Sequence, residues 1–276
     1  YLAKALHWID PAWCQGDFFL ESSNPHLVFY TLVGPGTAVL TFPAVTWLGR
    51  VLALSLLATG WVGMVRRLAP DTWAGWTATT AFLLAASIGN LSGEWVVGGF
   101  ESKVVAYGLL AWSSAFGLAH HHRLAGTLCG LAISIHPIVG GWGLVLAVLA
   151  RPWPIDRLRL QQAALVVVCA LPGIIPVLGL LGNGSPRADT VQVFARLGHH
   201  LVPARFSLTW TTLYVTLASA WLVARFRAQR SPAETWWVRL VLGSVVVAAA
   251  GWALALDTPP DLADAPDAWT RIRLVS

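Results

Sequence analysis

Two carboxylates on one short polar stretch are the first residues that could do chemistry. Asp10 and Asp17 are separated by six residues, and no lysine or arginine lies between them. Carboxylates so placed could accept a proton in a transfer reaction or hold a divalent cation through oxygen ligands. A solvated acidic loop would show the same spacing, so both interpretations stay open.

A second candidate is an acid and a base at the start of an apolar run. Glu101 and Lys103 follow two glycines and precede the run that begins at Val104. Ionisable groups at the end of a lipid-facing helix are costly unless they are paired, hydrated or functional. An acid also stabilises a helix N-terminus, which is a structural alternative for Glu101. Because residues two apart do not share a helix face, we expect Glu101 and Lys103 not to be simple mutual partners.

A third group of candidates is cationic. Arg196, His199, His200 and Arg205 lie in one polar stretch, where Arg196 and His200 would share one side of a helical turn. Such a group suits contact with an anion. Two adjacent histidines without a third ligand at suitable spacing are weak evidence for zinc.

Single residues inside apolar segments complete the set of candidates. Arg50 lies about two turns inside a long apolar segment, so it should face the protein interior or extend to the near membrane surface. His136 and Pro137 separate two apolar segments that are each too short to cross about 30 Å of hydrocarbon. We expect a helical hairpin with His136 at its tip, well within or across the bilayer. A histidine bonded to a freed carbonyl at that tip is the structural alternative.

Composition decides the class of protein that must position these residues. The 276 residues are 56% hydrophobic and 11% charged, with a mean hydropathy of +0.64. A soluble domain carries roughly 25% charged residues. The sequence therefore predicts an all-α, polytopic transmembrane helical bundle that is integral to the cell membrane and passes through it several times. The net charge of +5 comes from arginines in short turns and predicts no nucleic-acid partner.

Apolar runs predict where the helices lie. Residues 27–42 should form a short helix interrupted by prolines, and residues 124–150 should form the hairpin around His136. The expected membrane crossings are residues 43–67, 73–90, 102–119, 160–182, 208–224 and 236–256. We treat 1–276 as a single transmembrane domain. We expect it to be a fragment truncated at both ends, because residues 1–8 look like the tail of a span and residues 269–276 could open another.

The basic residues predict the orientation. Arginines gather at alternate turns, which places those turns in the cytoplasm. The outer loops are then about residues 9–26, 91–101, 183–207 and 257–268. The candidate site would therefore lie on the extracytoplasmic side.

Several short motifs carry a resemblance to a known family. They are Ile9-Asp10-Pro11, Asp17-Phe18-Phe19-Leu20, Phe100-Glu101-Ser102-Lys103, Ser134-Ile135-His136-Pro137-Ile138-Val139-Gly140 and Gly198-His199-His200-Leu201-Val202-Pro203. In these motifs the chain resembles an uncharacterised bacterial family of polytopic membrane proteins related to the GT-C glycosyltransferase superfamily. The resemblance spans most of the 276 residues.

The resemblance implies a reaction and a role for each candidate. It implies transfer of a sugar from a polyprenyl-phosphate donor in the membrane lipid to an acceptor at the outer face. Asp10 or Asp17 would be catalytic as the base. The substrate-binding residues would be Arg50, Glu101, Lys103, His136, Arg196, His199, His200 and Arg205. Many members have an Asp-x-Asp pair that this chain lacks, so a divalent cation is left open.

Two other classes of protein fit the same residues. A polytopic transporter or lipid flippase would use Arg50 and the broken hairpin as a substrate pathway. An internal inverted repeat would favour that class, and we find none in the sequence. The third class is a membrane protein without catalytic activity.

Overall fold

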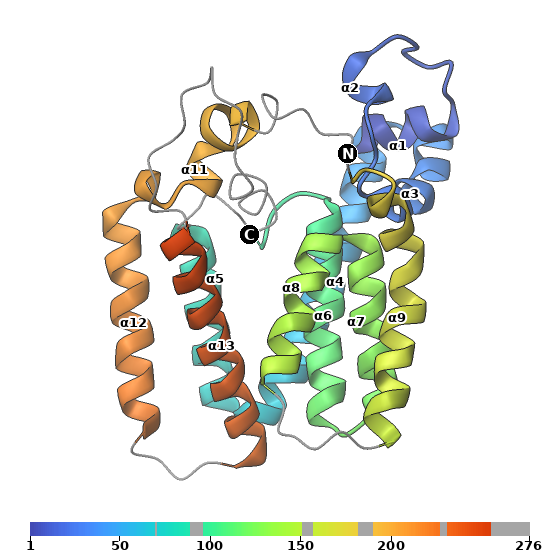
Figure 1. Ribbon diagram of the computed structural model, residues 1–276. Coiled ribbons are helices and arrows are strands. Elements are labelled where there is room, and N and C mark those ends of the chain that lie inside the picture. The colour runs from blue at the N-terminus through green and yellow to red at the C-terminus, as the bar shows by residue number, and fades with distance from the viewer. Residues whose placement is uncertain (70, 89–95, 151–156, 182–189, 227–230, 255–276) are drawn as a thin grey trace. The chain divides into compact units, whose positions relative to one another are not determined.

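The computed structural model describes residues 1–69, 71–88, 96–150, 157–181, 190–226 and 231–254, and these residues are helical with no strand among them (Figure 1). The all-α fold class is thereby confirmed. The α-helices are α1 (Leu2–Ile9), α2 (Phe18–Glu21), α3 (Leu27–Val39), α4 (Phe42–Leu68), α5 (Thr72–Ile88), α6 (Ser102–Leu118), α7 (His122–Ile135), α8 (Pro137–Leu149), α9 (Arg157–Leu178), α11 (Gly198–Leu201), α12 (Leu208–Phe226) and α13 (Pro232–Leu254). A π-helix, η1 (Val191–Arg196), and a 3-10 turn, η2 (Pro203–Arg205), lie between α9 and α12.

Three of the described helices are long and apolar enough to cross a membrane. They are Phe42–Leu68, Arg157–Leu178 and Pro232–Ala253. The apolar faces of α4 and α9 remain exposed, with Leu52 70% and Val168 62% accessible, as lipid-facing residues would be. These features identify a helical protein suited to a membrane. The GT-C-like arrangement and the truncation of the chain stay predictions.

The chain divides into two compact units. Unit 1 comprises Tyr1–Ala78, Val96–Val145 and Pro152–Leu181, and unit 2 comprises Thr79–Trp95, Leu146–Arg151 and Gly182–Ser276. Because each unit is compact in itself, the single transmembrane domain expected for 1–276 stays a prediction. The outer loop expected at 257–268 lies outside the described residues.

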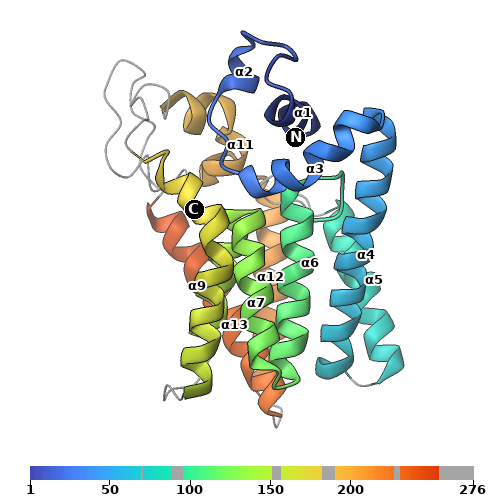
Figure 2. The same cartoon turned by 90° about the vertical axis from the view of Figure 1, so that its right-hand side faces the viewer.

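Unit 1 is built on four helices that lie side by side. They follow one another as α4, α6, α7 and α9, and each contacts the next in this series (Figure 2). The helices α1 and α3 pack on each other at the end where α4 and α6 begin. The predicted break at His136 is confirmed, because α7 and α8 are separate helices that meet there, and the position of this tip in the bilayer stays a prediction.

Glycines allow the backbones in unit 1 to approach closely. A Cβ added at Gly130 of α7 would lie 2.5 Å from the Val166 carbonyl oxygen of α9. A Cβ at Gly140 of α8 would overlap the backbone of Ile133 in α7. Small residues permit this approach, which gains van der Waals contact where lipid offers no hydrophobic driving force. These contacts hold α7 against α9 and the start of α8 against α7.

Ser134 fastens α7 to α9 at a break in the α9 hydrogen-bond ladder. Its hydroxyl donates to the Cys169 carbonyl at 2.7 Å and accepts from the Gly173 N–H at 3.1 Å. In an uninterrupted α-helix that N–H and that carbonyl would bond to each other. Pro172 removes a backbone donor from α9 and crowds its preceding turn, and the Ser134 side chain of α7 bonds to the backbone there.

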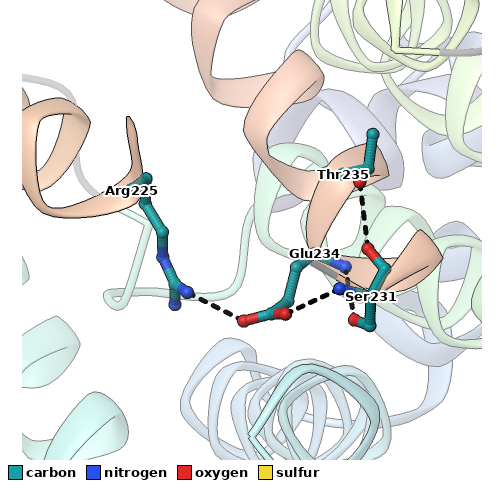
Figure 3. Close-up of polar contacts among 4 residues, drawn as sticks. All are labelled: Arg225, Ser231, Glu234 and Thr235. Carbon is teal, nitrogen blue, oxygen red and sulfur yellow. Dashed lines mark hydrogen bonds and ion pairs between the residues drawn. The ribbon is translucent and has the colours of Figure 1, made fainter. Parts of the chain in front are cut away.

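Unit 2 contains a short helical turn with a network of polar contacts at the start of α13. Ser231 Oγ accepts from the Glu234 N–H at 3.2 Å, and Glu234 Oε2 accepts from the Ser231 N–H at 3.0 Å (Figure 3). This reciprocal pair is a capping box. Arg225 at the end of α12 then donates to Glu234 Oε1 at 2.7 Å, which ties α12 to α13.

Candidate functional site

Glu101 and Lys103 form an ion pair at the start of α6. Lys103 Nζ lies 3.3 Å from Glu101 Oε2, and the two side chains are 13% and 23% exposed respectively. The expectation that they would not be partners is wrong. Glu101 is the N-cap with φ −136° and ψ 154°, an extended conformation, so the rule for helix faces does not apply to it. From that position its carboxylate can reach Lys103 in the first turn of α6.

His26 and His136 form a close pair of imidazoles. Their ring centroids lie 4.5 Å apart with an interplanar angle of 39°. His26 is the N-cap of α3, and His136 is the C-cap of α7 at the corner with α8. Burial, with a smaller contribution from nearby positive charge, lowers the pKa of His26 to about 3 and that of His136 to about 4. The pair is therefore neutral at physiological pH.

Lys4 holds the segment that precedes His26. The residue is 5% exposed, and Nζ lies within hydrogen-bond distance of four oxygens of Ser22, Ser23 and Asn24, at 2.8 to 3.1 Å. The ammonium also lies 5.0 Å from the centroid of the Phe19 ring. Burial lowers the pKa of Lys4, and the four acceptors compensate for the water it has lost. Lys4 thereby fixes where the chain turns into α3.

An apolar layer supports these groups. Ala5, Phe29, Tyr30 and Ile135 are buried together, with Phe100 packed against them. They come from α1, α3, α7 and the segment before α6, which are the same segments that carry the polar residues. We refer to Lys4, His26, Glu101, Lys103 and His136 as the polar cluster. Sequence reasoning found three of its members and missed Lys4 and His26.

Lys4 and His26 differ in how clearly the sequence marks them as candidate residues. Lys4 is a lone lysine in an apolar segment, and such a residue is by default a functional or structural candidate. His26 follows Asn24-Pro25 at the start of an apolar run, and nothing in that spacing marks it as a partner of His136. Their pairing arises only when α3 packs against α7.

Asp10 and Asp17 are exposed and cap backbone turns. An Asp10 carboxylate oxygen accepts from the Ala12 N–H at 3.2 Å. Asp17 is the N-cap of α2, and one of its oxygens accepts from the Leu20 N–H at 2.9 Å. The neighbouring Glu21 accepts from the Gly16 N–H at 2.6 Å. The acidic stretch therefore has a local structural role that its spacing alone did not reveal.

Arg50 lies on the outward side of α4, so the alternative that places it in the protein interior is wrong. Its side chain is exposed, and its guanidinium carbon lies 5.7 Å from the centroid of the Trp47 ring. The buried side of α4 is formed by small and apolar residues such as Gly49 and Ala53, which face α6. Trp47 is nearer the start of the helix, so Arg50 extends toward that end, as the alternative of a reach to the near surface requires.

The cationic candidates at 196–205 belong to unit 2. Arg196 ends η1 and His200 lies in α11, so the two do not share one continuous helix, contrary to expectation. Leu197 interrupts the helix with φ −111° and ψ 22°. Arg205 Nη1 donates to the Phe194 carbonyl at 2.6 Å and packs on Gly198, beside a cluster of Val193, Phe194 and Val202. The side chains of His199 and His200 lie outside the described residues.

The structure thus joins part of the expected site. Glu101, Lys103 and His136 lie together with Lys4 and His26 at one end of unit 1. Asp10 and Asp17 cap turns in the same unit, and Arg196, His199, His200 and Arg205 lie in the other unit. Among the described residues no group of three or more histidines, cysteines and acids is placed to hold a metal ion.

Comparison with known proteins adds no relative. No protein family, curated protein or solved structure matches the chain.

Proposed function

We propose that the protein is a multi-pass membrane glycosyltransferase that uses a polyprenyl-phosphate-linked sugar at the extracytoplasmic face. The observation that carries the proposal is the polar cluster at one end of the apolar helices of unit 1. It combines an ammonium group at the start of a helix with two imidazoles and a carboxylate. A phosphate favours both a helix N-terminus and a cationic side chain. The exposed apolar faces of α4 and α9 suit a polyprenyl tail.

Each candidate residue has a role in this proposal. The acceptor hydroxyl attacks the anomeric carbon, the bond from that carbon to the phosphate oxygen breaks, and the phosphate leaves with the bonding electrons. Asp10 or Asp17 takes the acceptor proton. Lys103, with Glu101 beside it, offsets the charge on the leaving phosphate. A divalent cation would require ligands beyond those that the described residues bring together.

Arg196, His199, His200 and Arg205 are proposed as contacts to an anion within unit 2, and Arg50 as a contact near the membrane surface in unit 1. One nitrogen of Arg205 already bonds to a carbonyl, which leaves the rest of its guanidinium fork to meet an anion.

The test is transfer by the purified full chain in nanodiscs. Radiolabelled polyprenyl-phosphate hexoses and pentoses serve as donors, and loss of label from the lipid is measured. The variants are Asp10→Asn and Asp17→Asn, because an amide oxygen still caps a turn but cannot accept the proton. The matched control is Asp71→Asn, which caps the first turn of α5 in the same way.

We expect one of the two loop variants to lower the rate of transfer by about 10²-fold or more, while Asp71→Asn retains it. The unfolding midpoint of each variant should match that of the wild type. Transfer that is equal in all variants would contradict the assignment of the base. Failure of the wild type to consume any donor in the panel would contradict the proposed activity.

A further inference from the structure

The imidazoles of His26 and His136 differ in how their nitrogens are used. His136 Nδ1 accepts from the Val139 N–H at 3.2 Å, which places the proton of the neutral ring on Nε2. His26 Nδ1 is buried, and it has no hydrogen-bond partner among the described residues. A buried nitrogen without a partner costs free energy, because it has given up water and gained nothing. His26 is therefore the ring of this pair whose Nδ1 no described hydrogen bond occupies, whereas Nδ1 of His136 is already in use.

The groups that face the pair disfavour that proton while the site is empty. From α1 this group is Lys4, and Tyr30 contributes a neutral phenol from α3. From α6, Lys103 acts on His136, and its charge is offset by Glu101. The ionisable side chains of α9 are Arg157, Arg159 and Cys169, and the arginines lie in its first turn at the opposite end of unit 1. Lys4 remains as a positive charge with only neutral acceptors.

We propose that His26 and His136 form a proton-binding site coupled to an anion, in which the imidazole of His26 takes up a proton from solvent when a phosphate-type group binds beside Lys103. This inference rests on the proposed function for the identity of the anion. One neutral imidazole becomes an imidazolium, and no other bond forms or breaks. The Val139 N–H keeps its acceptor on His136, so the corner between α7 and α8 does not have to rearrange.

The expected size of the effect follows from the charges. An opposite charge within about 4 to 6 Å raises a histidine pKa by roughly 1 to 3 units. Burial is the main reason that the pKa of His26 is lowered to about 3, and a bound anion nearby would raise it toward its ordinary value. Binding should then take up a measurable fraction of a proton at pH 6 and a smaller one at pH 7.5. Binding should also be tighter at the lower pH.

Calorimetric titration of the full chain in detergent tests this. Binding enthalpies measured at pH 6 in buffers with different ionisation enthalpies give the number of protons taken up. Inorganic sulfate is one probe, because it does not titrate between pH 5 and pH 8, so every proton counted belongs to the protein. Farnesyl phosphate is the other probe, and it separates recognition of a lipid headgroup from recognition of a free anion.

Three variants complete the experiment. His26→Gln should abolish the proton uptake, and His136→Gln should reduce it while its amide oxygen can still accept from Val139. The matched control is His121→Gln, an exposed histidine that precedes α7 at the opposite end of unit 1, which should behave as the wild type. The unfolding midpoint of each variant shows whether it has kept its fold.

The possible failures are distinguishable. Binding without proton uptake in the wild type, or equal uptake in the wild type and His26→Gln, would overturn the coupling alone. Absence of binding by both probes would overturn both the coupling and the phosphate contact in the proposed function. Binding of sulfate but not farnesyl phosphate, with proton uptake, would support the coupling and argue against a lipid donor.

Discussion

At the residue scale, burial decides which of the candidate side chains change their chemistry. The two carboxylates chosen from the sequence are exposed and bond to neighbouring backbone N–H groups. The two histidines are removed from water and lie against each other, so their proton affinity falls. Local spacing could suggest Asp10 and Asp17, but it carries no information about the packing of α3 against α7. Burial in the folded protein therefore distinguishes the two histidines from the two carboxylates, which the sequence alone does not.

The histidine pair should make stability depend on pH. Because the folded pKa values lie below the ordinary value of about 6.5, the unfolded chain binds more protons, so the free energy of unfolding falls as the pH falls below 6.5. At pH 5 each histidine should have lowered the free energy of unfolding by about 2 kcal/mol relative to its value at neutral pH. Unfolding in mixed micelles at several pH values measures this. The double variant His26→Gln/His136→Gln should lose most of the slope, and His121→Gln should keep it. An unchanged slope in the double variant would contradict the burial of the pair.

Ser134 makes a second prediction at this scale. Ser134→Ala leaves the Cys169 carbonyl and the Gly173 N–H without their shared partner, so it should lower the free energy of unfolding by about 1 to 3 kcal/mol. Ser87→Ala is the control, since that exposed hydroxyl bonds only to a carbonyl of its own helix. Its effect should stay within about 0.5 kcal/mol. Equal effects of the two substitutions would show that the inserted hydroxyl contributes no special stability.

At the element scale, the sequence predicts helices well where apolar runs end at prolines, glycines or arginines. The run expected at 43–67 is α4, Phe42–Leu68, and Pro43 lies in its first turn, where proline is favoured. The short helix expected at 27–42 is α3, Leu27–Val39, with Pro35 inside it. Short helical turns were missed, because α2 and the turns at 191–205 are too short to show a periodic pattern. Their caps, such as Asp17, are visible only in the structure.

Adjacent glycines in α8 offer a matched test of helix approach. A Cβ at Gly140 would overlap the Ile133 backbone, whereas a Cβ at Gly141 would meet no atom within 4 Å. Gly140→Ala should therefore destabilise the protein by about 1 to 3 kcal/mol, since a backbone has to move. Gly141→Ala should be neutral or slightly stabilising, because alanine favours a helix. Unfolding of both variants measures the difference, and the reverse order would place the contact on the wrong face of α8.

At the scale of the whole molecule, the ends of unit 1 differ in charge. The polar cluster lies where α4 and α6 begin, and Arg66, Arg67, Arg123, Arg157 and Arg159 lie at the other end of the helices. The positive-inside rule needs only the composition of the loops, so the sequence alone predicts this asymmetry. The packing of one helix on another depends on contacts between distant segments, which neither hydropathy nor charge encodes.

The charge asymmetry predicts which end of unit 1 faces the outside. Native Cys14 is exposed near the polar cluster, so a membrane-impermeant thiol reagent should label it in intact cells. In a variant without Cys14, a cysteine introduced at Ala69 should label only after permeabilisation. Cys129 is buried and should stay unreactive under both conditions. Labelling of both sites in intact cells would refute the orientation.

The enclosure of the Lys4 ammonium has a consequence for amine chemistry. The chain contains two lysines, and both belong to the polar cluster: the ammonium of Lys4 lies within hydrogen-bond distance of four oxygens, and that of Lys103 is paired with Glu101. Acylating reagents attack the free amine, which is scarce while a proton is held by such acceptors. Mass spectrometry after brief acetylation should therefore find Lys4 much less modified in the folded protein than in the unfolded chain. Because the chain has no lysine elsewhere, the rate of lysine acetylation measures how often this end of unit 1 opens.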